Sequence, residues 1–206
     1  MVERTIGLVR TFLVDLKHTD PVKFRHFIKG DAHIAVDFRK ILELGLSGYF
    51  QEIELYHKQV DRSDREGVRK DKFYTALTIG LESFQAFIRR YRDMAIYLSK
   101  ESNDYQLTTE LQLIAENCDL IAEKPPQNFY QALQLVYFVQ LILQIESNGH
   151  SVSLGRLDQY LYPFYRKDMT AGILSESFAS EILENTWIKL LSVNKIRPWS
   201  HTRFSA

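Results

Sequence analysis

One segment near the middle of the chain limits what the chain can fold into. Residues 128–145 read NFYQALQLVYFVQLILQI and contain no charged side chain. A segment of this length reaches the lower limit for a helix that crosses a membrane. Two features argue against a membrane span: the segment lacks basic flanks, and it contains Gln131, Gln134, Gln140 and Gln144. We therefore expect a helix that is buried by the rest of a soluble protein, with no membrane partner.

The other long segments also have helical periodicity. Apolar residues recur at spacings of three and four, with charges between them, in residues 35–59, 65–100, 105–122 and 175–193. Pro125 and Pro126 cannot continue a helix, and Asn128 is a suitable N-cap for the buried helix that follows. Only residues 151–154 and the tail around 199–204 have the character of strands. The sequence thus predicts a mainly α fold with a few short strands.

Composition and charge narrow the function classes. The 206 residues include 26 basic and 26 acidic side chains, so no net charge favours nucleic acid as a partner. A chain of this length usually forms one domain. A single cysteine, Cys118, excludes an internal disulfide framework and a cysteine-based metal site. Charged residues interrupt the apolar N-terminus, which therefore looks like a helical arm rather than a secretory signal, and we expect a cytoplasmic protein.

Two patterns have a chemical and a structural interpretation. Glu54 and His57 form an E-x-x-H on a predicted helix, but a di-iron site needs a second copy and two more glutamates. No second copy occurs, so a solvated helix face is the better interpretation and no metal is expected. Cys118 lies between the helical neighbours Ile114 and Ile121, which favours a structural thiol in the core over a nucleophile.

Three polar residues lie where helices begin or end. His33 precedes the helix predicted for residues 35–59, where the positive end of the helix dipole favours a neutral imidazole that can donate or accept a proton. An exposed loop histidine is the alternative. His150 and Ser151 follow the buried helix, and they either help to end it or present polar groups to a ligand. The residues alone leave these alternatives open.

Three blocks of the sequence resemble the glycyl radical enzymes, the group that includes pyruvate formate-lyase. The blocks are GDAHIAVDFRKILELGLSGY, the long block from KPPQNFYQALQ through ESNGHSVSLGRLDQYLYPFYRKD, and NKIRPWSHTRFSA. The run SNGHS is most similar to the eliminase branch, which contains the glycerol and diol dehydratases. The resemblance implies a partial α/β ten-stranded barrel surrounded by helices. It also implies that residues 1–206 are an internal fragment of one pyruvate formate-lyase-like domain, with an N-terminal helical arm at 1–23 and a family-like region at 24–206.

The resemblance implies roles for four residues. His33 falls on the histidine that is thought to handle the proton of the departing hydroxyl, so it is the candidate catalytic residue. His150 and Ser151 fall on the His-Ser pair that contacts substrate hydroxyls. Arg25 falls near the position that reads the substrate, and an arginine there suits a carboxylate or a sulfonate.

The chain also departs from the family pattern. The family needs a cysteine in a C-x-E motif and a glycine that stores the radical, whereas Cys118 is followed by Asp119 and Leu120 and no radical-glycine motif is present. We therefore expect this chain to be inactive alone. The resemblance implies that its parent enzyme is a lyase of anaerobic metabolism, either a dehydratase or an enzyme similar to formate C-acetyltransferase. The implied partners are a small-molecule substrate, an S-adenosylmethionine-dependent activating enzyme and a second copy in a homodimer. No bound cofactor is implied, because the glycyl radical of the parent enzyme lies outside this chain. The alternative is a catalytically dead helical interaction module derived from this fold.

Overall fold

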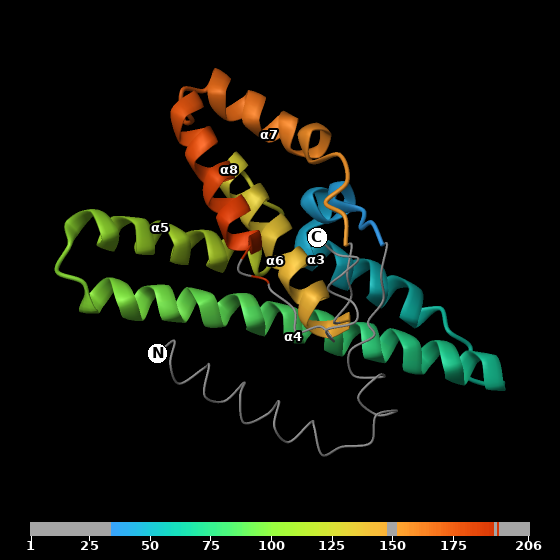
Figure 1. The fold of residues 1–206 in the computed structure, drawn as a ribbon. Coiled ribbons are helices and arrows are strands. Elements are labelled where there is room, and N and C mark those ends of the chain that lie inside the picture. The colour runs from blue at the N-terminus through green and yellow to red at the C-terminus, as the bar shows by residue number, and fades with distance from the viewer. Residues whose placement is uncertain (1–33, 148–151, 192, 194–206) are drawn as a thin grey trace, which may run out of the picture.

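The computed structural model describes residues 34–147, 152–191 and 193. Within these residues the chain forms helices connected by short segments (Figure 1). Their bounds are α3 Phe38–Lys58, α4 Arg65–Glu101, α5 Tyr105–Ile121, α6 Phe129–Ser147, α7 Leu157–Thr170 and α8 Glu176–Leu191. In the described part of the chain, no helix is long and apolar enough to cross a membrane.

Helix α6 is the centre of the fold. It contacts four other helices, α3, α5, α7 and α8 (Figure 1). Most residues in its first three turns are buried, including Leu133, Leu135 and Val136. The prediction of a buried helix at 128–145 is therefore confirmed. Its burial against four other helices explains why the segment needs no charged side chain.

Polar side chains at the helix starts explain where most helices begin. Asp37, Asp64 and Asp104 cap α3, α4 and α5 by accepting hydrogen bonds from backbone N–H groups in the first turn. The expected cap of α6 is present, since Asn128 Oδ1 accepts from the N–H of Gln131 at 2.9 Å. Ser175 Oγ accepts from the N–H of Phe178 at the start of α8, at 3.2 Å. These starts follow from local sequence.

Helix α3 bends at Gly45, a feature that the sequence analysis did not predict. The backbone of Gly45 has φ 61° and ψ −177°, inside a segment that is helical on both sides. The connection between α5 and α6 lies against this point, and the N–H of Ser47 donates to the carbonyl of Glu123 at 2.7 Å. A Cβ atom on residue 45 would lie 2.3 Å from the backbone nitrogen of Pro125. Glycine is therefore required both by its conformation and by the close approach of the chain.

The predicted fold class is wrong for the described residues. They contain no strand and no sheet, and the ten-stranded barrel is not formed; one isolated parallel bridge pairs Ala35 with Ser153. Of the strand predicted at 151–154, the structure describes residues 152–154. The carbonyl groups of Val152 and Leu154 accept hydrogen bonds from side chains and not from a neighbouring strand. A ladder needs those carbonyls to face another backbone. The tail at 199–204 lies outside the described residues.

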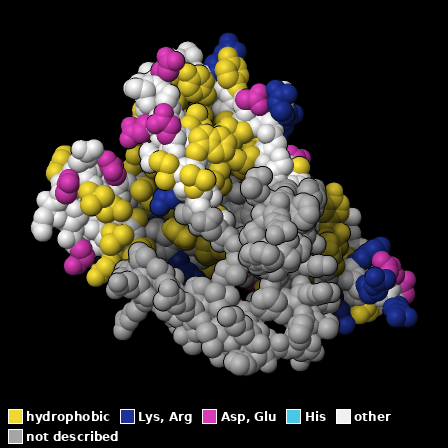
Figure 2. Space-filling view, viewed as in Figure 1, with side chains coloured by type: hydrophobic (Ala, Val, Ile, Leu, Met, Phe, Trp, Pro, Cys, Tyr) yellow, Lys and Arg dark blue, Asp and Glu magenta, His cyan; other side chains and the backbone are white. Residues whose placement is uncertain are grey.

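Large hydrophobic side chains reach the surface in several places, which include two groups on α8 and on the α4–α5 hairpin. One group lies on α8 and includes Trp187, Ile188 and Leu191, which is 74% exposed. The other lies at the free end of the α4–α5 hairpin and includes Tyr97 and Tyr105. Figure 2 shows hydrophobic side chains over both regions. Apolar surface of this kind is typical of regions that contact further protein.

Candidate functional site

The four residues predicted for the site, Arg25, His33, His150 and Ser151, lie outside the described residues. The residues that follow two of them directly, Ile34 and Val152, are described. The site can therefore be built from the described segments that lead away from His33 and from Ser151.

These two segments lie side by side although they are far apart in the sequence. The N–H of Ser153 donates to the carbonyl of Ile34 at 2.9 Å, and Ala35 forms the isolated bridge with Ser153. Ile34 is one residue from His33, and Ser153 is two residues from Ser151. Backbone contacts thus join the two segments for which the sequence analysis predicted a catalytic histidine and a substrate-contacting pair.

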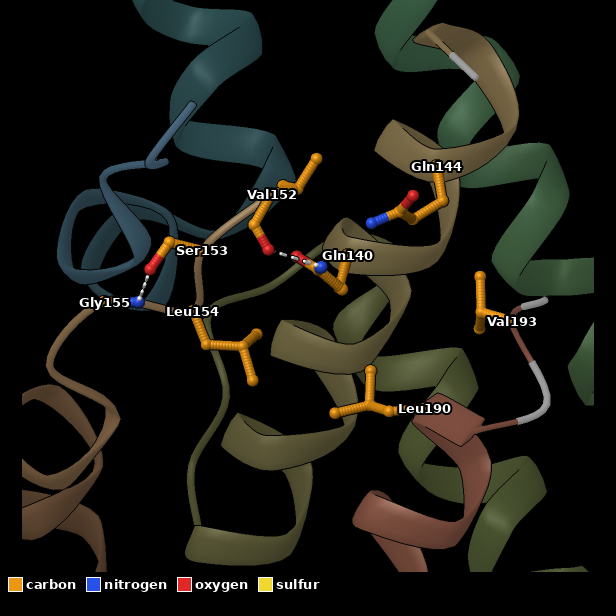
Figure 3. Close-up of a pocket in the computed structure, with 8 residues that line it drawn as sticks. All are labelled: Gln140, Gln144, Val152, Ser153, Leu154, Gly155, Leu190 and Val193. Carbon is orange, nitrogen blue, oxygen red and sulfur yellow. Dashed lines mark hydrogen bonds between the residues drawn. The ribbon is translucent and has the colours of Figure 1, made fainter. Parts of the chain in front are cut away.

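A cavity of about 470 Å³ lies beside this contact. Its walls come from α6, from the segment 152–155 and from the end of α8, as Figure 3 shows. The lining residues are Gln140, Gln144, Val152, Ser153, Leu154, Gly155, Leu190 and Val193. None of them carries a charge, and both glutamine side chains extend toward the segment 152–155. The described walls therefore suit a small polar molecule that is bound through neutral hydrogen-bonding groups.

Side chains from two helices hold the segment 152–155. Gln140 Nε2 donates to the carbonyl of Val152 at 3.0 Å, and the hydroxyl of Tyr160 on α7 donates to the carbonyl of Leu154 at 2.8 Å. Tyr160 also stacks on Phe38, with ring centroids 5.4 Å apart. Burial raises the pKa of Tyr160, so its hydroxyl stays protonated and remains a donor. The segment is held by fixed contacts from α6 and α7.

Gln140 combines burial with an incomplete set of hydrogen bonds. Its side chain is 6% exposed, and its Oε1 atom has no hydrogen-bond partner among the described residues. An unpaired buried acceptor is costly and marks a position that needs an explanation. Sequence reasoning used Gln140 and Gln144 only as arguments against a membrane span. Their signal was a pair of amides four residues apart, a spacing that places both on one face of a helix.

The two other glutamines of α6 have structural partners. Gln131 Nε2 donates to Asn117 Oδ1 at 3.1 Å, and Gln134 Nε2 donates to the sulfur of Cys118 at 3.1 Å. Cys118 is completely buried, and burial raises the pKa of its thiol to about 12. A thiol of this kind is unreactive near neutral pH. The interpretation of Cys118 as a structural core thiol is confirmed.

The E-x-x-H pattern has no role at the cavity. His57 Nε2 lies 2.7 Å from Asp71 Oδ1, and Arg62 binds the same carboxylate. A hydrogen bond from His57 and, to a smaller extent, one from Arg62 hold the pKa of Asp71 below its ordinary value. Glu54 is exposed and forms an ion pair with Lys58, as expected for a solvated helix face. Over the described ranges, no group of three or more His, Cys, Asp or Glu side chains is arranged to hold a metal ion.

Comparison with known proteins identifies the family. The family model described as "Pyruvate formate lyase-like" matches residues 15–206. The chain is 47% identical over 178 residues to the "Probable dehydratase YbiW" of Escherichia coli (strain K12), covering 86% of this chain and 22% of that protein. It is 36% identical to the (2S)-3-sulfopropanediol dehydratase of Klebsiella oxytoca, covering 82% of this chain and 20% of the relative.

A solved structure contains a segment with a similar fold. The B12-independent glycerol dehydratase of Clostridium butyricum, with glycerol bound, matches with a TM-score of 0.80 and 33% identity, covering 84% of this chain and 22% of that one. The chain therefore spans about a fifth of the length of the proteins that it matches. The family model's match over residues 15–206 includes the buried helix and the residues on both sides of it. The chain belongs to the pyruvate formate lyase-like family and resembles the glycyl radical dehydratases within it.

Proposed function

We propose that this chain forms part of the substrate site of a glycyl radical lyase that removes water or another leaving group from a small hydroxylated substrate. The observation that carries the proposal is the hydrogen bond from Ser153 to Ile34, which joins the segments next to Ser151 and His33 beside a cavity with neutral polar walls. Relatives that are named as dehydratases support the class of reaction.

In this proposal each site residue has a separate task. His150 and Ser151 bind hydroxyl groups of the substrate by hydrogen bonds. His33 donates a proton to the departing hydroxyl, which leaves as water. The radical of the parent enzyme would supply the removal of a hydrogen atom from the substrate and its return to the radical that is left after the leaving group has departed.

We assign Arg25 to an anionic group of the substrate. The described cavity walls carry no charge that could pair with an anionic group. An arginine contributed by residue 25 would pair with a sulfonate or a carboxylate through two parallel hydrogen bonds. One relative is named for a sulfonated diol, and a matched structure is named for the neutral glycerol. The arginine favours the first kind of substrate.

The same proposal includes a requirement for further protein. The sequence contains neither a C-x-E motif nor a radical-glycine motif, and Cys118 is buried and unreactive. The chain alone would therefore not carry out radical elimination. The exposed hydrophobic residues of α8 and of the α4–α5 hairpin are suitable surfaces for that protein, including a second copy in a homodimer. An S-adenosylmethionine-dependent activating enzyme would generate the radical in the cytoplasm.

A segment exchange tests the proposal. Residues 24–193 replace the matching segment of the Clostridium butyricum glycerol dehydratase, which is activated under anoxic conditions and assayed for aldehyde formation and for its radical signal. We expect turnover that His33→Ala reduces by at least about a hundredfold at an unchanged radical yield. The matched control is His57→Ala, because His57 lies in the last turn of α3, contacts Asp71 on α4 and does not line the cavity. Equal turnover by the His33→Ala protein and the unsubstituted exchange would refute the proposal.

The assignment of Arg25 has its own measurement. In the same exchange protein, Arg25→Ala is compared on (2S)-3-sulfopropanediol and on 1,2-propanediol. Loss of a bidentate contact should raise KM for the sulfonate by about tenfold or more and leave KM for the neutral diol nearly unchanged. Equal effects on both substrates would show that Arg25 does not read substrate charge.

A further inference from the structure

We propose that Gln144 binds the hydroxyl groups of a small organic molecule in the cavity between α6 and the segment 152–155. The hydrocarbon part of that molecule packs on the apolar residues that line the same cavity. The inference rests on the proposed function, because it assigns a substrate-contacting residue to the proposed substrate cavity. Every residue that carries it lies in the described part of the chain.

Three polar side chains line the described walls of the cavity, and two of them already hold the protein together. Gln140 Nε2 donates to the carbonyl of Val152 at 3.0 Å. Ser153 Oγ accepts from the N–H of Gly155 at 3.0 Å, a contact within the segment itself. Figure 3 shows both hydrogen bonds as dashed lines. These two side chains are therefore used to fix the segment 152–155.

Gln144 is the third polar side chain, and its amide forms no hydrogen bond with the described residues. It lies one turn after Gln140 on α6, and it extends toward the segment 152–155 in Figure 3. An amide has donor hydrogens and an acceptor oxygen, so it can donate to one hydroxyl group and accept from another. Two neighbouring hydroxyl groups, as in a diol, match both parts of this amide.

The other glutamines of α6 show that an amide with a structural task has a protein partner. Gln131 donates to Asn117, Gln134 to Cys118 and Gln140 to Val152. An amide whose neighbours supply no hydrogen bond is satisfied by water or by a ligand. The cavity of about 470 Å³ has room for either. A ligand whose hydroxyl groups reproduce the hydrogen bonds of water can replace that water at Gln144.

The other side chains that line the described walls are apolar. Leu154 belongs to the segment 152–155, Leu190 lies near the end of α8, and Val193 follows that helix. A neutral amide beside apolar side chains suits a molecule that has hydroxyl groups at one end and carbon-bound hydrogens at the other. An anionic group of the substrate would need a partner elsewhere, as the assignment of Arg25 requires.

Titration of the 206-residue chain with 1,2-propanediol tests the contact without turnover. NMR follows the side-chain amide protons of Gln144 and the methyl groups of Leu190 and Val193. We expect saturable shifts of all three. Gln144→Met keeps the length of the side chain but loses both hydrogen-bonding groups, so it should bind the diol at least about tenfold more weakly. The control is Gln134→Met, the same change on the same helix, which should bind the diol as the unsubstituted chain does.

A measurement on the unsubstituted chain decides the question if Gln144→Met fails to fold. Nuclear Overhauser effects between the side-chain amide protons of Gln144 and the carbon-bound protons of the diol would place the ligand at this amide. Shifts that rise without saturation, or the absence of these Overhauser effects at saturation, would overturn the inference. Equal affinity of Gln144→Met and the unsubstituted chain would overturn it as well.

Kinetics of the exchange protein separate this contact from the proposed function. A contact made equally to substrate and transition state acts on KM, so Gln144→Met should raise KM by about tenfold and leave kcat nearly unchanged. The effect should be the same for (2S)-3-sulfopropanediol and 1,2-propanediol, because the amide reads hydroxyl groups and not charge. A loss of kcat at constant KM would show a structural role and contradict the inference. If His33→Ala has no effect on turnover, the proposed function fails, whereas the diol titration still decides the role of Gln144.

Discussion

Replacement of Gly45 by alanine is the sharpest test of how this fold is held together. Gly45 interrupts α3 at the point where the connection between α5 and α6 approaches it. That connection leads directly into the central helix α6. A change at residue 45 should therefore disturb the packing of α3 against α6 and not only the local backbone.

Two effects add up at this position. The backbone of Gly45, with φ 61° and ψ −177°, lies in a region that alanine adopts only under strain of about 1–3 kcal/mol. The added Cβ would also lie 2.3 Å from the nitrogen of Pro125 and 2.5 Å from the carbonyl carbon of Lys124. These are backbone atoms that cannot rotate away, and overpacking of this kind costs about 1–3 kcal/mol. After a small gain from the unfolded state, Gly45→Ala should destabilise the chain by about 3–5 kcal/mol.

Urea unfolding, followed by circular dichroism at 222 nm, measures the effect. The matched control is Gly80→Ala, because Gly80 lies within the regular helix α4 and a Cβ there would meet no atom within 4 Å. Alanine is the better helix former, so this control should be more stable by about 0.5–1 kcal/mol. The reasoning is refuted if Gly45→Ala changes the free energy of unfolding by less than about 1 kcal/mol, well below the strain expected for that backbone.

Other positions give further predictions. Asp168 is 2% exposed and accepts a hydrogen bond from the N–H of Phe129 at 2.6 Å, so Asp168→Ala should lower the free energy of unfolding by about 2–3 kcal/mol. The control is Asp158→Ala, at an exposed position, and an equal loss in both variants would contradict the importance of the buried hydrogen bond. Asn128→Ala removes the cap of α6 and should lower the free energy of unfolding by about 1 kcal/mol in the same measurement, and an unchanged value would show that the cap does not stabilise the fold. Burial raises the pKa of Cys118 from 9.0 to about 12, so its contribution to stability is complete below pH 9 and is lost as the pH rises toward 12. Iodoacetamide at pH 8 should therefore label Cys118 only in denaturant, and rapid labelling of the folded chain would contradict its burial.

The helices show why some elements were predictable. The start of α6 was expected from Asn128, because a cap acts within three residues of the helix start, and the start of α8 was expected near residue 175 from the apolar periodicity of 175–193. Helix α7 was not predicted. Its N-cap residue, Arg156, makes no side-chain cap, and Pro163 lies inside the helix. The spacing of Leu157, Leu161 and Phe164 was the available signal, but their contact with α6 becomes visible only in the folded chain.

The strand prediction failed for a related reason. Alternation at residues 151–154 correctly indicated that Val152 is buried and Ser153 is exposed. It did not indicate what the backbone would bind, and in the described residues the partners are the side chains of Gln140 and Tyr160 and the carbonyl of Ile34. Alternation reports which face of a segment is apolar, whereas a strand also requires a neighbouring backbone.

The sequence by itself determined several local features: the apolar helix at 128–145, the cap of α6 and the burial of Cys118. These depend on residue type and on spacing within a few turns. Tertiary structure decided three other features: the bend at Gly45, the approach of Ile34 to Ser153 and the hydrogen bond from Gln140 to the carbonyl of Val152. Each of these depends on a contact between residues distant in the chain, and a hydrogen bond of this kind forms only after packing has brought its two groups together and excluded water.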